Sequence, residues 1–119
     1  ANEIESMSII GDVTGQDVVL IDDICDTAGT LSKAAALIME NGANSVRAVC
    51  THAVLSGKAY DTIENSVLTE MIVTDTIKLD AEKAKNSTKI KVLSTADLFA
   101  KAIKSVNQHS SISDLFDVD

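Results

Sequence analysis

The sequence has 119 residues and a mass of 12.6 kDa, which is the size of one ordinary domain. Apolar residues make up 45% of it and charged residues 24%, so the chain can bury a core and intrinsic disorder is excluded. Asp and Glu number 18 against 10 Lys and Arg, and this net charge of −8 argues against nucleic-acid binding, which requires clustered basic residues.

The first half of the chain alternates between strand and helix patterns. A short extended run at residues 7–10 precedes a turn, and the branched apolar run at residues 18–21 predicts a strand buried on both faces, as in a parallel sheet. The two runs together predict an N-terminal edge hairpin. Good helix formers predict a helix over residues 28–41, and Gly42 is expected to end it in the left-handed conformation.

The second half continues the alternation. Further strands are predicted at residues 46–50, 71–74 and 90–93, and a short helix over residues 58–63. Residues 94–97 resemble a capping box before an amphipathic helix. Strands alternating with helices predict an α/β fold, with a mostly parallel sheet flanked by helices on both faces, in one domain over residues 1–119.

No apolar run approaches the ~20 residues that a membrane span needs, and the acidic start does not resemble a signal peptide. Cys25 and Cys50 lie in unrelated contexts, so we expect a reducing, cytoplasmic setting without a disulfide or zinc site. Two readings of Cys25 are open, a reactive thiol beside a helix N-terminus or a filler of a loop position, the second being favoured. His52 either contacts a ligand or makes a structural hydrogen bond, and the structural reading is again favoured.

The most informative segment follows the strand at residues 18–21. Two carboxylates, Asp22 and Asp23, end that strand, and a loop then opens directly into the helix through Asp26, Thr27, Ala28, Gly29 and Thr30. Ligands of open α/β sheets bind beyond the carboxyl ends of the strands, and a helix N-terminus offers free N–H groups to a phosphate. Carboxylates accept hydrogen bonds from vicinal hydroxyls and coordinate Mg²⁺. The segment therefore predicts a ligand with a diol and a phosphate, such as ribose 5-phosphate.

This segment resembles the ribose-phosphate-binding loop of the phosphoribosyltransferase fold, which transferases share with the ribose-phosphate pyrophosphokinases. Four other segments are similar to the pyrophosphokinases, in the same order: residues 1–5, 51–57, 72–77 and 111–116. The resemblance covers nearly the whole chain but only the C-terminal part of that enzyme. The chain departs from the family pattern at Ala53, Lys58, Asp75 and Lys78.

The resemblance implies that Asp22 and Asp23 hold the ribose hydroxyls, with any Mg²⁺ held only indirectly, and that residues 26–30 wrap the 5-phosphate. It also implies a regulatory nucleotide or phosphate site that includes Ser111, Ser113 and Phe116. The intact enzyme would be a cytoplasmic homo-oligomer. It would transfer a diphosphoryl group from ATP to ribose 5-phosphate, making phosphoribosyl pyrophosphate for nucleotide biosynthesis.

In the family, the ATP pocket and the catalytic loop come from the preceding domain, and none of their motifs is found in this sequence. We therefore expect no catalytic residue here and no turnover by the isolated chain. Three alternatives stay open: a small phosphoribosyltransferase, a non-catalytic regulatory homologue and, less favoured, a two-component receiver domain. The first would need a base-binding segment. A receiver would need an acceptor aspartate after its third strand and would leave the loop at residues 26–30 without a purpose.

Overall fold

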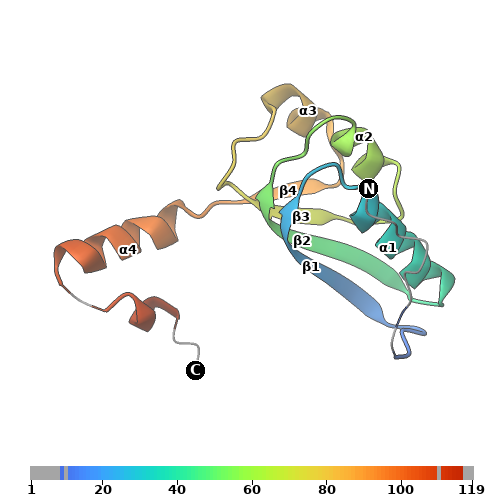
Figure 1. Ribbon diagram of the computed structural model, residues 1–119, viewed down its shortest axis with the longest axis horizontal. Helices are drawn as coiled ribbons and strands as arrows, with labels where there is room; N and C mark the ends of the chain where they lie inside the picture. Colours follow the sequence, from blue (N-terminus) through green and yellow to red (C-terminus); the bar gives the residue numbers. More distant parts are fainter. Residues whose placement is uncertain (1–8, 10, 110, 117–119) are drawn as a thin grey trace.

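The computed structural model describes residues 9, 11–109 and 111–116. Its centre is a parallel sheet in which the four strands follow one another in chain order (Figure 1). The strands are β1 (Asp17–Cys25), β2 (Ser45–Ala53), β3 (Met71–Thr74) and β4 (Ile90–Leu93). Consecutive strands are connected through α1 (Gly29–Glu40), α2 (Ala59–Glu64) and α3 (Ala81–Asn86), and β4 is followed by α4 (Ala96–Asn107) and the 3₁₀ helix η1 (Ser113–Phe116).

The hydrophobic core lies between one face of the sheet and the helices α1 and α2. Alternate residues of the two central strands point into it, because side chains alternate between the faces of a strand. The residues buried in this alternation are Val46, Ala48 and Cys50 of β2 and Met71 and Val73 of β3, and Ala53 is also buried at the end of β2. The helices meet them with small and branched side chains at helical spacing: Leu31, Ala35 and Ile38 from α1, and Ala59, Tyr60 and Ile63 from α2.

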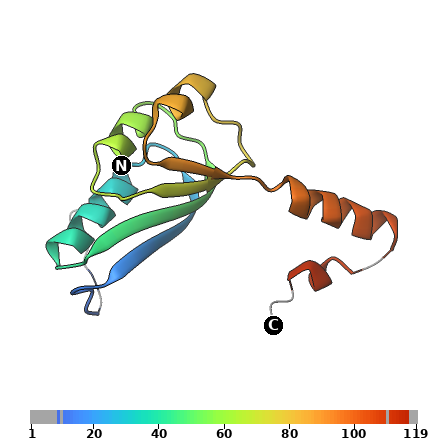
Figure 2. The same ribbon diagram turned by 180° about the vertical axis from the view of Figure 1, so that it is seen from behind.

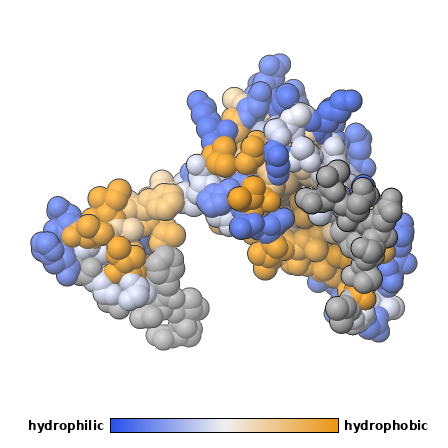
Figure 3. Space-filling model, in the orientation of Figure 1, coloured by the Kyte–Doolittle hydropathy of each residue, from blue (hydrophilic) through white to orange (hydrophobic). Residues whose placement is uncertain are grey.

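The opposite face of the sheet carries no helix in the described part of the chain (Figures 1 and 2). On β1, Val19 is 52% exposed and Ile21 is 83% exposed, so the predicted burial of this strand on both faces is wrong. Figure 3 shows apolar side chains gathered over the strands. Right-handed crossovers that advance along a sheet in one direction place all their helices on one face, and these strands advance without reversal. The α/β class and the parallel sheet are confirmed, whereas the expectation of helices on both faces is corrected to one.

Helix α4 extends away from the sheet, and its start is fixed to the end of β3 (Figure 1). Asp75 accepts hydrogen bonds from the backbone N–H of Thr95, at 2.8 Å, and from its hydroxyl. The predicted capping box is therefore wrong, because Thr95 is the N-cap residue and its side chain does not cap the helix. The amphipathic pattern of the helix is present, and its apolar residues are exposed: Leu98, Phe99, Ile103 and Val106.

Most predicted elements are found close to their expected bounds, with the strands at residues 71–74 and 90–93 matching in full. Gly42 has the expected positive φ, 93°, after α1. Helix α3 was missed, because it buries no residue and so gives no apolar periodicity; the Asp80 side chain caps it by accepting from the N–H of Lys83, at 3.0 Å. The first run of the predicted hairpin, residues 7–10, lies outside the described residues except for Ile9.

The two faces of the sheet predict opposite responses to the same truncation. Ile63→Ala removes a fully buried side chain of α2 and should cost about 2–5 kcal/mol of unfolding free energy, since it leaves a cavity. The matched control Ile21→Ala, on the uncovered face, should change it by about 0.5 kcal/mol or less. Urea unfolding followed by circular dichroism measures both. Equal losses would contradict the one-sided core.

Candidate functional site

The loop from β1 to α1 surrounds an open hollow of about 250 Å³ at the carboxyl edge of the sheet. All of the residues predicted to hold ribose 5-phosphate line this hollow, except Asp23. The full lining is Asp22, Ile24, Cys25, Asp26, Thr27, Ala28, Gly29, Thr30 and Leu31. The fold thus brings one predicted carboxylate and the whole predicted phosphate loop to a single concave surface.

Backbone N–H groups give this hollow its chemical character. Ala28, the N-cap of α1, is in the left-handed conformation with φ of 67°, which costs a residue with a Cβ of the order of 1 kcal/mol. Its N–H hydrogen-bonds to the Cys25 thiol. No acceptor in the described part of the chain takes the N–H groups of Thr27, Gly29 or Thr30, and no side chain caps the helix. Unpartnered N–H groups at the positive end of a helix dipole favour an anion.

Asp22 and Asp23 lie within β1, which continues to Cys25 beyond the predicted end of the strand, and the two acids have different surroundings. Asp22 lines the hollow, whereas Asp23 does not. The backbone N–H of Asp23 donates to Oδ1 of Asp22 at 2.8 Å, which orients the Asp22 carboxylate. Among the described residues, no group of three or more His, Cys, Asp or Glu side chains is arranged to hold a metal. Asp22 and Asp26 nevertheless place two carboxylates in the lining of the hollow, and Mg²⁺ keeps most of its waters and is bound through one or two carboxylates and substrate phosphates.

A second loop, between β2 and α2, lies directly against residues 26–30, which are called the phosphate loop after their predicted ligand. The carboxylate of Asp26 accepts a hydrogen bond from the hydroxyl of Ser56. The backbone carbonyl of Asp26 accepts from the N–H of Ser56 at 2.9 Å. Sequence reasoning gave Ser56 no role of its own and included it only in the similar segment at residues 51–57. No periodicity or motif marks the contact, because it joins residues that are 30 positions apart.

His52 ends β2 at the same edge of the sheet and makes a structural hydrogen bond. Its Nδ1 lies 2.8 Å from the hydroxyl oxygen of Thr76, in the loop after β3. The Thr76 hydroxyl lies in turn 3.1 Å from the carbonyl oxygen of Thr51 and donates to it. The favoured reading of His52 is therefore supported, since its ring connects two loops rather than lining the hollow.

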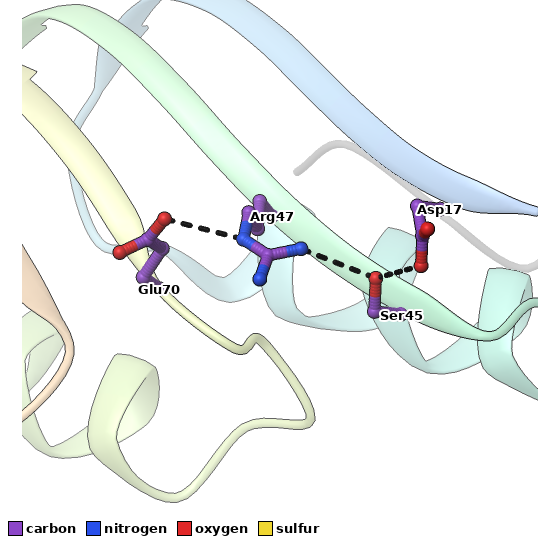
Figure 4. A network of polar contacts seen from close by, with 4 residues as sticks. All are labelled: Asp17, Ser45, Arg47 and Glu70. Atoms are coloured by element: carbon purple, nitrogen blue, oxygen red, sulfur yellow. Dashed lines mark hydrogen bonds and ion pairs between the residues drawn. The ribbon is translucent and has the colours of Figure 1, made fainter.

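The single arginine, Arg47, makes its polar contacts away from the hollow. Arg47 forms an ion pair with Glu70 at 3.2 Å and donates to the Ser45 hydroxyl at 3.3 Å, while Ser45 donates to Asp17 at 2.7 Å (Figure 4). Hydrogen bonds from Ser45 and Asn44 lower the pKa of Asp17. This network crosses the strands toward their amino ends, whereas the hollow lies at the carboxyl end of β1, so Arg47 does not contribute to the hollow.

The residues of the expected regulatory site are not brought near the hollow. Ser111 and Ser113 are exposed, lie beyond α4 and face each other with hydroxyl oxygens 2.7 Å apart (Figure 1). The side chain of Phe116 lies outside the described part of the structure. The structure therefore separates the two expected sites along the chain and in space.

A family model, curated relatives and a solved structure all relate the chain to one family of enzymes. The family model described as phosphoribosyl synthetase-associated domain matches residues 1–117. Ribose-phosphate pyrophosphokinases of Campylobacter jejuni and a Marinomonas species are 55% and 53% identical over 116 residues, which is 98% of this chain but 36% of theirs. The crystal structure of phosphoribosylpyrophosphate synthetase from Mycobacterium smegmatis matches with a TM-score of 0.80 and 37% identity, over 85% of this chain and 33% of that one. No helix among the described residues is long and apolar enough to cross a membrane.

Burial predicts slow alkylation of the two free thiols, Cys25 and Cys50. Burial raises the pKa of Cys25 to about 11 and also raises that of Cys50. At pH 7.5 both thiols should react with iodoacetamide more than about tenfold slower than in the urea-unfolded chain, because the thiolate is the nucleophile. Mass spectrometry of alkylated peptides measures the rates. Rapid labelling of Cys25 in the folded chain would revive the reactive-thiol reading.

Proposed function

Because the chain belongs to the phosphoribosyl synthetase-associated family, we propose that it is the ribose 5-phosphate-binding part of a ribose-phosphate pyrophosphokinase. The intact enzyme transfers the diphosphoryl group of ATP to the anomeric hydroxyl of ribose 5-phosphate. In this proposal, residues 26–30 hold the 5-phosphate, Asp22 accepts hydrogen bonds from the ribose hydroxyls, and Asp23 fixes the orientation of Asp22.

One observation carries the proposal, namely the unpartnered N–H groups of Thr27, Gly29 and Thr30 beside the Asp22 carboxylate. A phosphate needs several converging donors, and the loop supplies them from the backbone without any basic side chain. The carboxylate cannot bind that phosphate, but it can accept from a diol at the other end of the same ligand. A sugar phosphate satisfies both halves of the hollow.

The chain spans 36% of the length of the curated relatives that it matches. We therefore assign the ATP pocket and the catalytic loop to the remaining polypeptide, and we regard residues 1–119 as the C-terminal domain of the enzyme. Mg²⁺, if present as in related phosphoryl-transfer chemistry, would neutralise charge on the phosphates, and Asp22 is the residue of this chain placed to hold its waters. A cytoplasmic homo-oligomer belongs to the same proposal.

The uncovered face of the sheet supports this division. In open α/β sheets, ligand crevices lie where the strand order reverses, and the described sheet has no reversal. A strand–helix–strand unit added at the free edge of β1, and progressing away from β1, would place its crossover helix over Val19 and Ile21. It would also create the reversal beside the hollow. The remaining polypeptide is thus suited both to cover this face and to wall the site.

Ligand binding tests the assignment of the hollow. We expect ribose 5-phosphate to shift the amide resonances of residues 27–30 in a ¹H–¹⁵N titration of the isolated chain. Thr30→Val should weaken those shifts, because it removes a hydroxyl donor from the first turn of α1, and it should leave the circular dichroism spectrum unchanged, because Thr30 is exposed. Shifts centred on any other surface, or none at millimolar ligand, would overturn the proposal.

Turnover tests the division of the enzyme. The isolated chain incubated with ATP, Mg²⁺ and ribose 5-phosphate should form no phosphoribosyl pyrophosphate, since transfer needs a nucleotide pocket and cations on the phosphates. Formation of AMP can be followed by chromatography, with the intact Campylobacter jejuni relative as positive control. Clear turnover by the chain alone would show that it holds the catalytic groups as well.

A further inference from the structure

We propose that Ser56 is a positioning residue for the ribose 5-phosphate site, acting through the carboxylate of Asp26. The inference rests on the proposed function of the hollow. Ser56 does not line the hollow, and the resemblance includes it in the similar segment at residues 51–57 without giving it a role. Its hydroxyl is the one side-chain group of the second loop that is hydrogen-bonded to the phosphate loop in the described part of the structure.

Backbone hydrogen bonds join the two loops around the contact between Ser56 and Asp26. The N–H groups of Val54 and Leu55 both donate to the carbonyl of Cys25, at 2.9 and 3.2 Å, and the N–H of Ser56 donates to that of Asp26. Leu55 is buried and has a positive φ of 49°, which the surrounding packing must hold in place. These backbone contacts place the Ser56 hydroxyl beside Asp26, and they would remain if the hydroxyl were removed.

The chemical need for this contact comes from the charge of Asp26. A carboxylate in a loop that binds phosphate repels the ligand, and Asp side chains readily accept from N–H groups up to three residues further along the chain, as in Asx turns and N-caps. A released Asp26 carboxylate would therefore compete with the phosphate for the N–H groups of Thr27 and Gly29. The Ser56 hydroxyl occupies that carboxylate and holds it against the second loop, which leaves the N–H groups open to the ligand.

Removal of the hydroxyl should thus affect binding more than folding. In Ser56→Ala, the backbone hydrogen bonds between the loops remain, and the exposed side chain contributes nothing to the core. We expect the dissociation constant for ribose 5-phosphate to rise roughly tenfold, the scale of one hydrogen bond to a charged group. Ser56→Thr keeps the hydroxyl and should restore affinity to within about twofold.

A matched control lies at the other end of the sheet. Ser87, before β4, also donates its hydroxyl to a carboxylate, that of Glu64, at 3.3 Å. The Ser87 hydroxyl also accepts from the N–H groups of Lys89 and Ile90, at 3.3 and 3.1 Å. Ser87→Ala should leave the dissociation constant unchanged, because none of these contacts involves the lining of the hollow. In the Asp26→Ala background, Ser56→Ala should have no further effect, because the two residues act as one unit.

The experiment combines calorimetric titration of the full 119-residue chain with ribose 5-phosphate and ligand-free amide spectra of each variant. Weaker binding in Ser56→Ala, restored by Ser56→Thr and absent in the Asp26→Ala background, supports the inference. Unchanged binding in Ser56→Ala, or equal losses in Ser56→Ala and Ser87→Ala, overturns it. If the unmodified chain binds no ribose 5-phosphate, the proposed function fails. In that case the amide resonances of Thr27, Gly29 and Thr30 are compared between the ligand-free Ser56→Ala variant and the ligand-free unmodified chain. Displaced resonances support the positioning role, and unchanged resonances overturn it.

Discussion

Parallel pairing of the four strands in strict chain order constrains every other feature of this molecule. Each strand must be followed by a connection that returns the chain to the starting edge of the sheet, and the right-handed form of that connection places each helix on the same face. All loops that follow the strands consequently meet at one edge. The hollow at the end of β1, His52 near the end of β2 and Asp75 after β3 lie at that edge for this reason.

The chemistry of the hollow depends on the backbone more than on side chains. A strongly acidic chain with one arginine cannot attract an anion through its net charge, and that arginine is paired with Glu70. Donors fixed at the start of α1 supply the attraction locally, at a distance where net charge matters less than orientation. The left-handed Ala28 is the N-cap residue among these N–H groups, and the contact between Asp26 and Ser56 keeps them open in the proposal made above.

Two apolar surfaces distinguish this chain from a self-contained α/β domain. One is the uncovered face of the sheet around Val19 and Ile21, and the other is the exposed stripe of α4 that includes Phe99 and Ile103. Parallel sheets are normally covered on both faces, because their strands are apolar on both sides. The matched relatives are nearly three times as long as this chain, and the proposal made above assigns the covering of the sheet face to the remaining polypeptide.

The sequence by itself determined the class of fold, the bounds of most helices and strands and the segment that forms the hollow, because these depend on local patterns: apolar runs, helix formers and the small residues between Asp22 and Thr30. Only the tertiary structure decided which face of the sheet is covered, that Asp22 rather than Asp23 lines the hollow, that Thr95 is held by Asp75, and that Ser56 meets Asp26. Each of these follows from strand order or from contacts between loops distant in the chain. Local sequence patterns do not predict these contacts, because loop residues lack the periodicity that packing imposes on helices and strands.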